Sequence, residues 1–153
     1  MIPKIIPCYN PPMIKIYTGG KKHDPWLAAA IAEYEKRLAK YWMISWRFVP
    51  DDKFDQLLKQ IPPTDFVILL DEHGENVTSE ILSAKIAQKI EQDQQISLII
   101  GGSYGVPESI KSRANWTWSL SNLVFPHKIC RLLVTEQLYR AQQIHQNHPY
   151  HHN

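Results

Sequence analysis

Two short, nearly uninterrupted apolar runs constrain the fold of this chain more than any other feature. They cover residues 66–70 and 96–100 of a sequence of 153 residues. Runs of this length that lack polar alternation are typical of strands buried on both faces, as in parallel sheets. The sequence therefore predicts a sheet with helices flanking it.

The rest of the chain alternates between strand-like and helical patterns. Further strands are expected at 14–18, 43–49 and 116–120, which brings the total to about five. The expected helices cover 25–41, 51–58, 79–90, a segment after Pro107, and 127–146. This alternation indicates an α/β fold with a mostly parallel sheet. An apolar content of 44% suits a single domain, which we expect to cover 13–153.

Polar residues mark where three of these helices begin. Asp24 precedes Pro25, a pair typical of an N-cap followed by the first helical residue. Asp51 or Asp52 is the expected cap of the second helix, and Thr78 or Ser79 that of the third.

Residues 1–12 are rich in proline and lack periodicity. We interpret them as a disordered or extended addition, with Met13 as an alternative start. They do not have the apolar core of a secretory signal, and no apolar run approaches the roughly 18 residues needed to span a membrane. Cys8 and Cys130 are far apart and form no C-x-x-C pair, which favours a reducing compartment. A cytoplasmic location is expected.

Two loops at predicted strand ends are candidate walls of one ligand pocket. The run 96–100 ends in Gly101-Gly102, and 116–120 is followed by the loop 121–126. Ligands of open α/β sheets bind at the carboxyl ends of strands, and glycine allows close approach to the backbone. The glycines fit neither the dinucleotide fingerprint nor a P-loop. A tight turn without a ligand is the alternative.

Two other groups of polar residues have alternative interpretations. Asp71, Glu72 and His73 follow a strand and are acid/base groups, metal ligands or, more simply, part of a solvated loop. The histidines of the tail are close in sequence, but a chain end broken by Pro149 places metal ligands poorly. No metal is expected.

Charge is distributed unevenly, although the formal net charge is only +2. After Gln94 the acids are Glu108 and Glu136, whereas the bases are Lys111, Arg113, Lys128, Arg131 and Arg140. A second basic group is Lys21-Lys22-His23, followed by Lys36, Arg37 and Lys40. Such a surface could face phosphates, or it could be ordinary solvated charge. Arg140 is either a phosphate or base contact, or the partner of Glu136 in a helical ion pair.

Several motifs, taken together, resemble the RlmH family of small bacterial methyltransferases, which belong to the SPOUT class. The motifs are Leu-Asp-x-x-Gly (70–74), Leu-Ile-Ile-Gly-Gly-x-x-Gly (98–105), Trp-Ser-Leu-Ser-x-Leu-x-x-Pro-His (118–127), Glu-Gln-Leu-Tyr-Arg-Ala (136–141) and Asn-His-Pro-Tyr-His (147–151). The resemblance extends from Met13 to the end of the chain.

The resemblance implies a SPOUT-type C-terminal trefoil knot, a homodimer and S-adenosylmethionine (SAM) as methyl donor. The implied reaction methylates nitrogen-3 of a pseudouridine in 23S ribosomal RNA on the assembled ribosome. The donor site it implies comprises Leu70, Gly102, Ser121, Asn122, Leu123, Val124, Phe125 and Pro126. The catalytic candidates are Arg140, which would hold a phosphate or carbonyl oxygen, and His148, Tyr150 and His151, which would position the base or accept its proton.

The chain departs from the family pattern in its tail, where His152 replaces a common arginine, and in Ser103, which replaces a common proline. Residues 1–12 have no counterpart in the family. Two rival functions are a non-catalytic ribosome- or RNA-binding module and a nucleotide-binding regulator. Neither rival predicts SAM binding.

Overall fold

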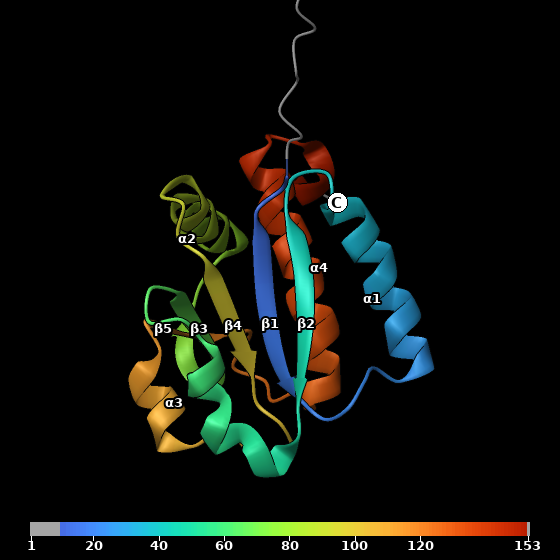
Figure 1. Ribbon diagram of the computed structural model, residues 1–153. Helices are drawn as coiled ribbons and strands as arrows, with labels where there is room; N and C mark the ends of the chain where they lie inside the picture. Colours follow the sequence, from blue (N-terminus) through green and yellow to red (C-terminus); the bar gives the residue numbers. More distant parts are fainter. Residues whose placement is uncertain (1–9, 153) are drawn as a thin grey trace, which may run out of the picture.

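The computed structural model describes residues 10–152, excluding the side chains of His151 and His152. Its strands are β1 (Met13–Gly19), β2 (Met43–Val49), β3 (Phe66–Asn76), β4 (Ile96–Ile100) and β5 (Trp116–Ser119). Its helices are α1 (Pro25–Leu38), α2 (Ser79–Glu91), α3 (Glu108–Arg113) and α4 (His127–His145), and its 3₁₀ segments are η1 (Asp51–Gln60) and η2 (Pro149–His152). Figure 1 shows these elements in place.

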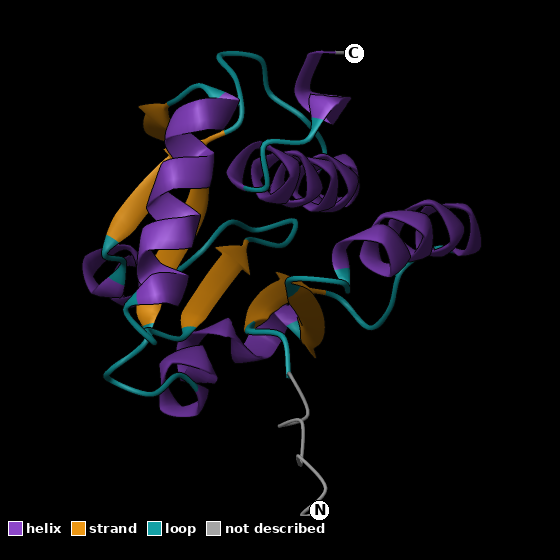
Figure 2. Cartoon of the chain, turned by 90° about the horizontal axis from the view of Figure 1, so that it is seen from above, coloured by secondary structure: helices purple, strands orange, loops and turns teal. Residues whose placement is uncertain are grey.

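The five strands form one sheet in the order β2-β1-β4-β3-β5, and every neighbouring pair is parallel. The predicted α/β class with a five-stranded parallel sheet is therefore confirmed. Helices α1, α2 and α4 cover one face of the sheet, whereas η1 and α3 cover part of the other (Figure 2). The trefoil knot stays a prediction.

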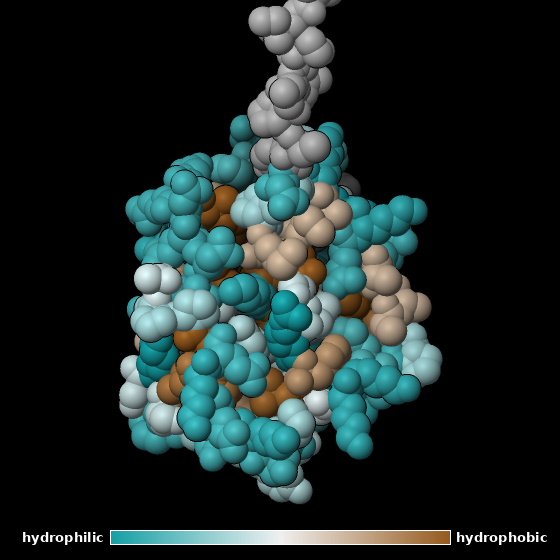
Figure 3. Space-filling view, viewed as in Figure 1, coloured by the Kyte–Doolittle hydropathy of each residue, from teal (hydrophilic) through white to brown (hydrophobic). Residues whose placement is uncertain are grey.

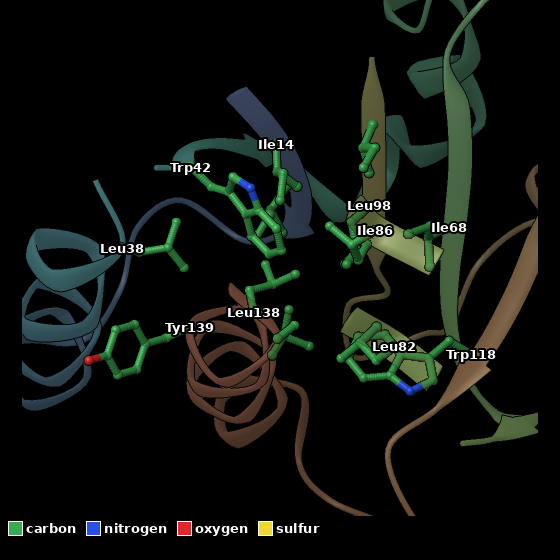
Figure 4. Packing of buried hydrophobic residues seen from close by; sticks show 14 of the residues in the cluster. Ile14, Leu38, Trp42, Ile68, Leu82, Ile86, Leu98, Trp118, Leu138 and Tyr139 are labelled. Atoms are coloured by element: carbon green, nitrogen blue, oxygen red, sulfur yellow. The ribbon is translucent and has the colours of Figure 1, made fainter. Parts of the chain in front are cut away.

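The larger core lies between the sheet and helices α1, α2 and α4 (Figure 4). Leu138 of α4 packs here with Leu82 of α2 and with Ile68 and Leu98 of the sheet. Buried polar groups tie the helices together, because Ser83 donates to the carbonyl of Ala141 at 2.6 Å. A smaller core on the other face packs η1 and α3 against the sheet. On that side polar side chains cover most of the surface (Figure 3).

Strand β3 is longer than the sequence predicted. The expected strand ended at Leu70, but β3 continues to Asn76 after a shift in its pairing with β5. Glu75 lies opposite Trp118, and the Trp116 indole donates to the Glu75 carboxylate at 2.8 Å. The loop interpretation of Asp71, Glu72 and His73 was therefore wrong, since all three lie within β3, although Glu72 and His73 are exposed to solvent as expected. The strand continues because β5 pairs with Glu75 and Asn76, a partner that the local sequence does not reveal.

The predicted N-cap residues are confirmed for α1 and α2 and wrong for η1. Thr78 caps α2, and its hydroxyl accepts a hydrogen bond from the Ile81 amide at 3.3 Å. Asp24 occupies the N-cap position of α1, but its carboxylate makes no capping bond and pairs with Lys128 at 2.8 Å. Pro50, and not an aspartate, is the N-cap of η1.

His23 is not part of a basic group, although the sequence suggested one. Both ring nitrogens are buried without a hydrogen-bond partner, and the ring packs edge-on against Trp46 and Phe48. Burial, reinforced by the nearby Arg131 charge, lowers the pKa of His23 to about 4. The side chain is therefore neutral near pH 7.

The buried His23 should make stability depend on pH. The unfolded chain binds a proton at this side chain below the ordinary histidine pKa of about 6.5, whereas the folded chain does not until about pH 4. Folding stability should therefore fall as pH drops from about 6.5 to 4. Urea unfolding across this range should show a flatter pH dependence for His23→Phe than for the wild type. His73→Phe, which removes an exposed histidine, is the control. An unchanged dependence in His23→Phe would contradict the assignment.

Candidate active site

A pocket of about 340 Å³ lies at the carboxyl ends of β3, β4 and β5. These three strands are neighbours in the sheet, so the residues that end them meet at one edge. Leu70 pairs with both Ile100 and Trp118, which places the predicted strand-end segments side by side. The first turns of α4 contribute His127 and Cys130 to the pocket.

Six of the eight predicted donor-site residues line this pocket. They are Leu70, Gly102, Ser121, Leu123, Val124 and Phe125. Asn122 and Pro126 do not line it. Asn122 accepts a hydrogen bond from Asn76 at 2.6 Å and so ties the loop to β3, whereas Pro126 is the N-cap residue of α4.

The loop 120–126 is held in shape by its own polar groups. The Ser121 hydroxyl accepts a hydrogen bond from the Leu123 amide at 3.0 Å, and the Ser121 carbonyl accepts one from Ser119 at 2.9 Å. Leu123 and Val124 are nevertheless 69% and 75% exposed at the pocket rim. The loop therefore presents apolar side chains and backbone groups to a ligand.

The glycine turn forms the opposite wall of the pocket. The Gly105 amide donates to the Gly102 carbonyl at 3.2 Å, and Gly105 has a φ of +74°. A side chain at Gly102 would collide with the carboxylate of Asp51. Glycine at 102 thus lets the turn lie directly against η1, and Ser103 is exposed in the turn.

Besides the six predicted residues, the pocket is lined by Ile100, Gly101, Ser103, Ser119 and Leu120, and by four residues with titratable side chains that the sequence did not assign to the donor site: Asp71, Glu72, His127 and Cys130. Asp71 and Glu72 directly follow Leu70, and this adjacency was the signal that could have found them. The carboxylate of Asp71 accepts a hydrogen bond from the His73 amide at 2.8 Å. Asp71 and Glu72 together make one wall of the pocket acidic.

His127 lies at the first position of α4 and is partly buried. Burial lowers its pKa, and the positive charges of Arg131 and Lys128 lower it further, against an opposing effect of Asp51. Burial also raises the pKa of the Cys130 thiol. Both groups therefore favour the uncharged form in the pocket.

The predicted catalytic residues form a separate cluster at the far end of α4. Arg140 pairs with Glu136 through nitrogen–oxygen distances of 2.6 and 3.0 Å, and its guanidinium lies over the Tyr150 ring. Tyr150 also donates to Glu136 at 3.3 Å, while His148 accepts from the Tyr150 amide. The side chain of His151 lies outside the described residues. The ion pair with Glu136 is therefore present, and a role for Arg140 in RNA contact stays a prediction.

The two clusters are well separated within one chain. Arg140 follows Cys130, the pocket residue farthest along α4, by 10 positions, which corresponds to about 15 Å along a helix. Figure 1 shows α4 running from the carboxyl ends of the strands toward their opposite ends, where η2 lies. The pocket and the tail of the same chain therefore do not form one site.

Comparison with known proteins identifies the family. A family model described as "Predicted SPOUT methyltransferase" matches residues 13–151. The chain belongs to the SPOUT methyltransferase family. "Ribosomal RNA large subunit methyltransferase H" of Dictyoglomus thermophilum is 38% identical over 150 residues, covering 90% of this chain and 98% of the relative. The protein of the same name from Methylobacillus flagellatus is 33% identical over 151 residues, covering 90% and 97%.

Solved structures of proteins described as methylases or methyltransferases share the fold at low sequence identity. A "probable methylase family protein" from Haemophilus influenzae Rd KW20 aligns with a TM-score of 0.58 at 12% identity, covering 90% of this chain and 69% of that one. A protein from Legionella pneumophila, whose structure contains the bound cofactor SAM, aligns with a TM-score of 0.50 at 11% identity, covering 86% and 67%. The family predicted from the motifs is confirmed by the family model and by the relatives of 33–38% identity. Within residues 10–152 no helix is long and apolar enough to cross a membrane.

Proposed function

We propose that the chain is a SAM-dependent methyltransferase that acts on nitrogen-3 of a pseudouridine in 23S ribosomal RNA, on the assembled ribosome. One observation carries the proposal: the strand-end segments at 70, 102 and 121–125 converge on one pocket. The relatives named as ribosomal RNA large subunit methyltransferases support the choice of substrate. We also propose that the protein is cytoplasmic and that residues 13–153 form a single domain.

The chemistry of the pocket fits the methyl donor. Its volume of about 340 Å³ lies within the range of small-molecule sites. Leu70, Leu123 and Phe125 offer apolar contact to an adenine ring, and backbone groups of the two loops can bind its polar edge. Asp71 and Glu72 would stabilise the positive sulfonium.

SAM supplies a methyl group already activated by its sulfonium, so the protein must mainly align nucleophile and donor. Transfer would break the methyl–sulfur bond, leave a neutral thioether and form the nitrogen–methyl bond, and the nitrogen-3 proton would have to pass to an acceptor. Burial and the Glu136 charge raise the pKa of Tyr150 to about 12, so its phenol stays protonated near pH 7 and is suited to positioning the base. His148 or His151 is the proposed proton acceptor.

The separation of the clusters supports a homodimer. If Arg140 and the tail act on the target base, they must approach the donor pocket of a second chain, because the nearest α4 residue of their own pocket, Cys130, lies about 15 Å away along the helix. Leu123 and Val124 expose apolar side chains at the pocket rim, and a partner chain could bury them. We therefore infer two composite sites for each dimer.

The function is tested by binding and by modification together. Isothermal titration calorimetry should detect SAM binding to the wild-type chain. Ribosomes from a strain that lacks the gene should gain one methyl group, mapped by mass spectrometry to a pseudouridine of 23S RNA, when incubated with protein and SAM. Absence of both binding heat and mass increase would favour the non-catalytic binding module instead.

A further inference from the structure

A second hollow lies beside the glycine turn. It measures about 510 Å³ and is lined by Gly20, Lys21, Pro50, Asp51, Asp52 and Tyr104. We call it the Tyr104 hollow. Its residues come from the loop after β1, from the start of η1 and from the turn after β4. It thus lies at the same edge of the sheet as the donor pocket.

Only a thin layer of backbone separates the two hollows. Gly102 lines the donor pocket and packs against Gly19, where a Cβ atom would stand 2.7 Å from the Gly102 Cα. The carboxylate of Asp51, which lines the Tyr104 hollow, lies so close to Gly19 and Gly102 that a side chain at either position would collide with it. A molecule in the Tyr104 hollow would therefore be a near neighbour of a molecule in the donor pocket.

The polar and aromatic groups of the hollow match the parts of a nucleotide. Tyr104 is 90% exposed at the tip of the turn 102–105, so its ring is free to stack on a base. Lys21 is exposed and can contact a phosphate. Asp52 is exposed and can accept hydrogen bonds from base amino or imino groups, as carboxylates do with cytosine.

We propose that the Tyr104 hollow binds an unpaired nucleotide next to the target, stacking its base on Tyr104 and reading an N–H-bearing edge with Asp52. The carboxylates would repel a bare phosphate backbone, so the base and not the phosphate is the main determinant. The inference rests on the proposed function, since it requires an RNA whose target is presented at the donor pocket. The Tyr104 hollow would thus contact a neighbouring base that is not itself methylated.

Steady-state methylation of ribosomes tests the stacking contact. Tyr104→Ala should raise KM for ribosomes about 5- to 150-fold, the range for loss of one stacked base, with kcat and SAM affinity little changed. Tyr104→Trp should keep KM for ribosomes near the wild-type value, because tryptophan retains a face on which a base can stack. Trp26→Ala, which removes another exposed aromatic side chain, is the matched control and should behave as wild type.

A second pair of variants tests the edge contact. Asp52→Asn should raise KM for ribosomes, whereas Asp55→Asn, an equal change of charge at an exposed position of the same η1 segment, should not. Equal KM values for Tyr104→Ala and wild type would overturn the proposal. So would an equal effect of both aspartate variants, or a loss of SAM affinity in Tyr104→Ala. A wild-type chain without SAM binding or turnover would instead refute the proposed function, and this proposal with it.

Discussion

Arg140→Ala is expected to lower kcat for methyl transfer by about 100-fold or more, because misplacing a reacting group by about 1 Å already costs this much. Affinity for SAM should stay at the wild-type value, since Arg140 is not among the residues that line the donor pocket. Calorimetry and single-turnover methylation of ribosomes measure the two quantities separately.

The chain contains a matched control for this experiment. Arg37 pairs with Glu33 four positions earlier on α1, at 3.0 and 3.1 Å, just as Arg140 pairs with Glu136 on α4. Arg37→Ala therefore removes the same kind of ion pair without touching the tail. Arg140→Lys should recover little activity, because lysine keeps the charge but loses the planar, bidentate guanidinium. Wild-type turnover by Arg140→Ala would show that the arginine serves only its ion pair.

Co-expression of two inactive chains tests whether the sites are composite. Gly102→Val should disable the donor pocket, because its side chain would collide with Asp51. A dimer of one Gly102→Val chain and one Arg140→Ala chain would then contain one site with both an intact pocket and an intact arginine. Partial recovery of activity is expected. Failure of separately stable, dimer-forming variants to complement each other would argue that each tail serves its own chain.

The fold was largely predictable because its signals are local. The apolar run 66–70 and the alternation of strand and helix patterns indicate a parallel α/β sheet without any knowledge of contacts. The continuation of β3 to Asn76 could not be predicted in this way. Its second half is held by β5, which lies about 40 residues later in the chain and pairs Glu75 with Trp118.

The site was predictable in part for a similar reason. Leu70, Gly102 and the loop 121–125 follow strands, and parallel strands bring such residues to one edge. Asp71 and Glu72 were left between a functional role and a solvated loop, because their local sequence lacks strand character. The distance from the pocket to Arg140 follows directly from the length of α4, so helix geometry alone argues that one chain cannot complete the site.

Gly74→Ala is expected to have the largest effect on stability of any small substitution near the site. A Cβ atom at this position would lie 2.7 Å from the Trp118 carbonyl carbon and 2.8 Å from the carbonyl carbon and oxygen of Thr117. All three are backbone atoms of β5, so β3 and β5 must separate to admit the methyl group. Overpacking of this kind costs about 1–3 kcal/mol, and we expect about 3 kcal/mol here.

Chemical denaturation should reveal this loss, and hydrogen exchange should localise it to the amides of β3 and β5. Gly101→Ala is the matched control, because its Cβ would meet the Val106 side chain at 3.3 Å, and a methyl group can move where a strand cannot. SAM affinity should also fall in Gly74→Ala, since Asp71 and Glu72 reach the pocket only while β3 stays paired with β5. If Gly74→Ala unfolded at the same denaturant concentration as the wild type, the second half of β3 would not be held against β5, and the acidic wall of the pocket would have no fixed position.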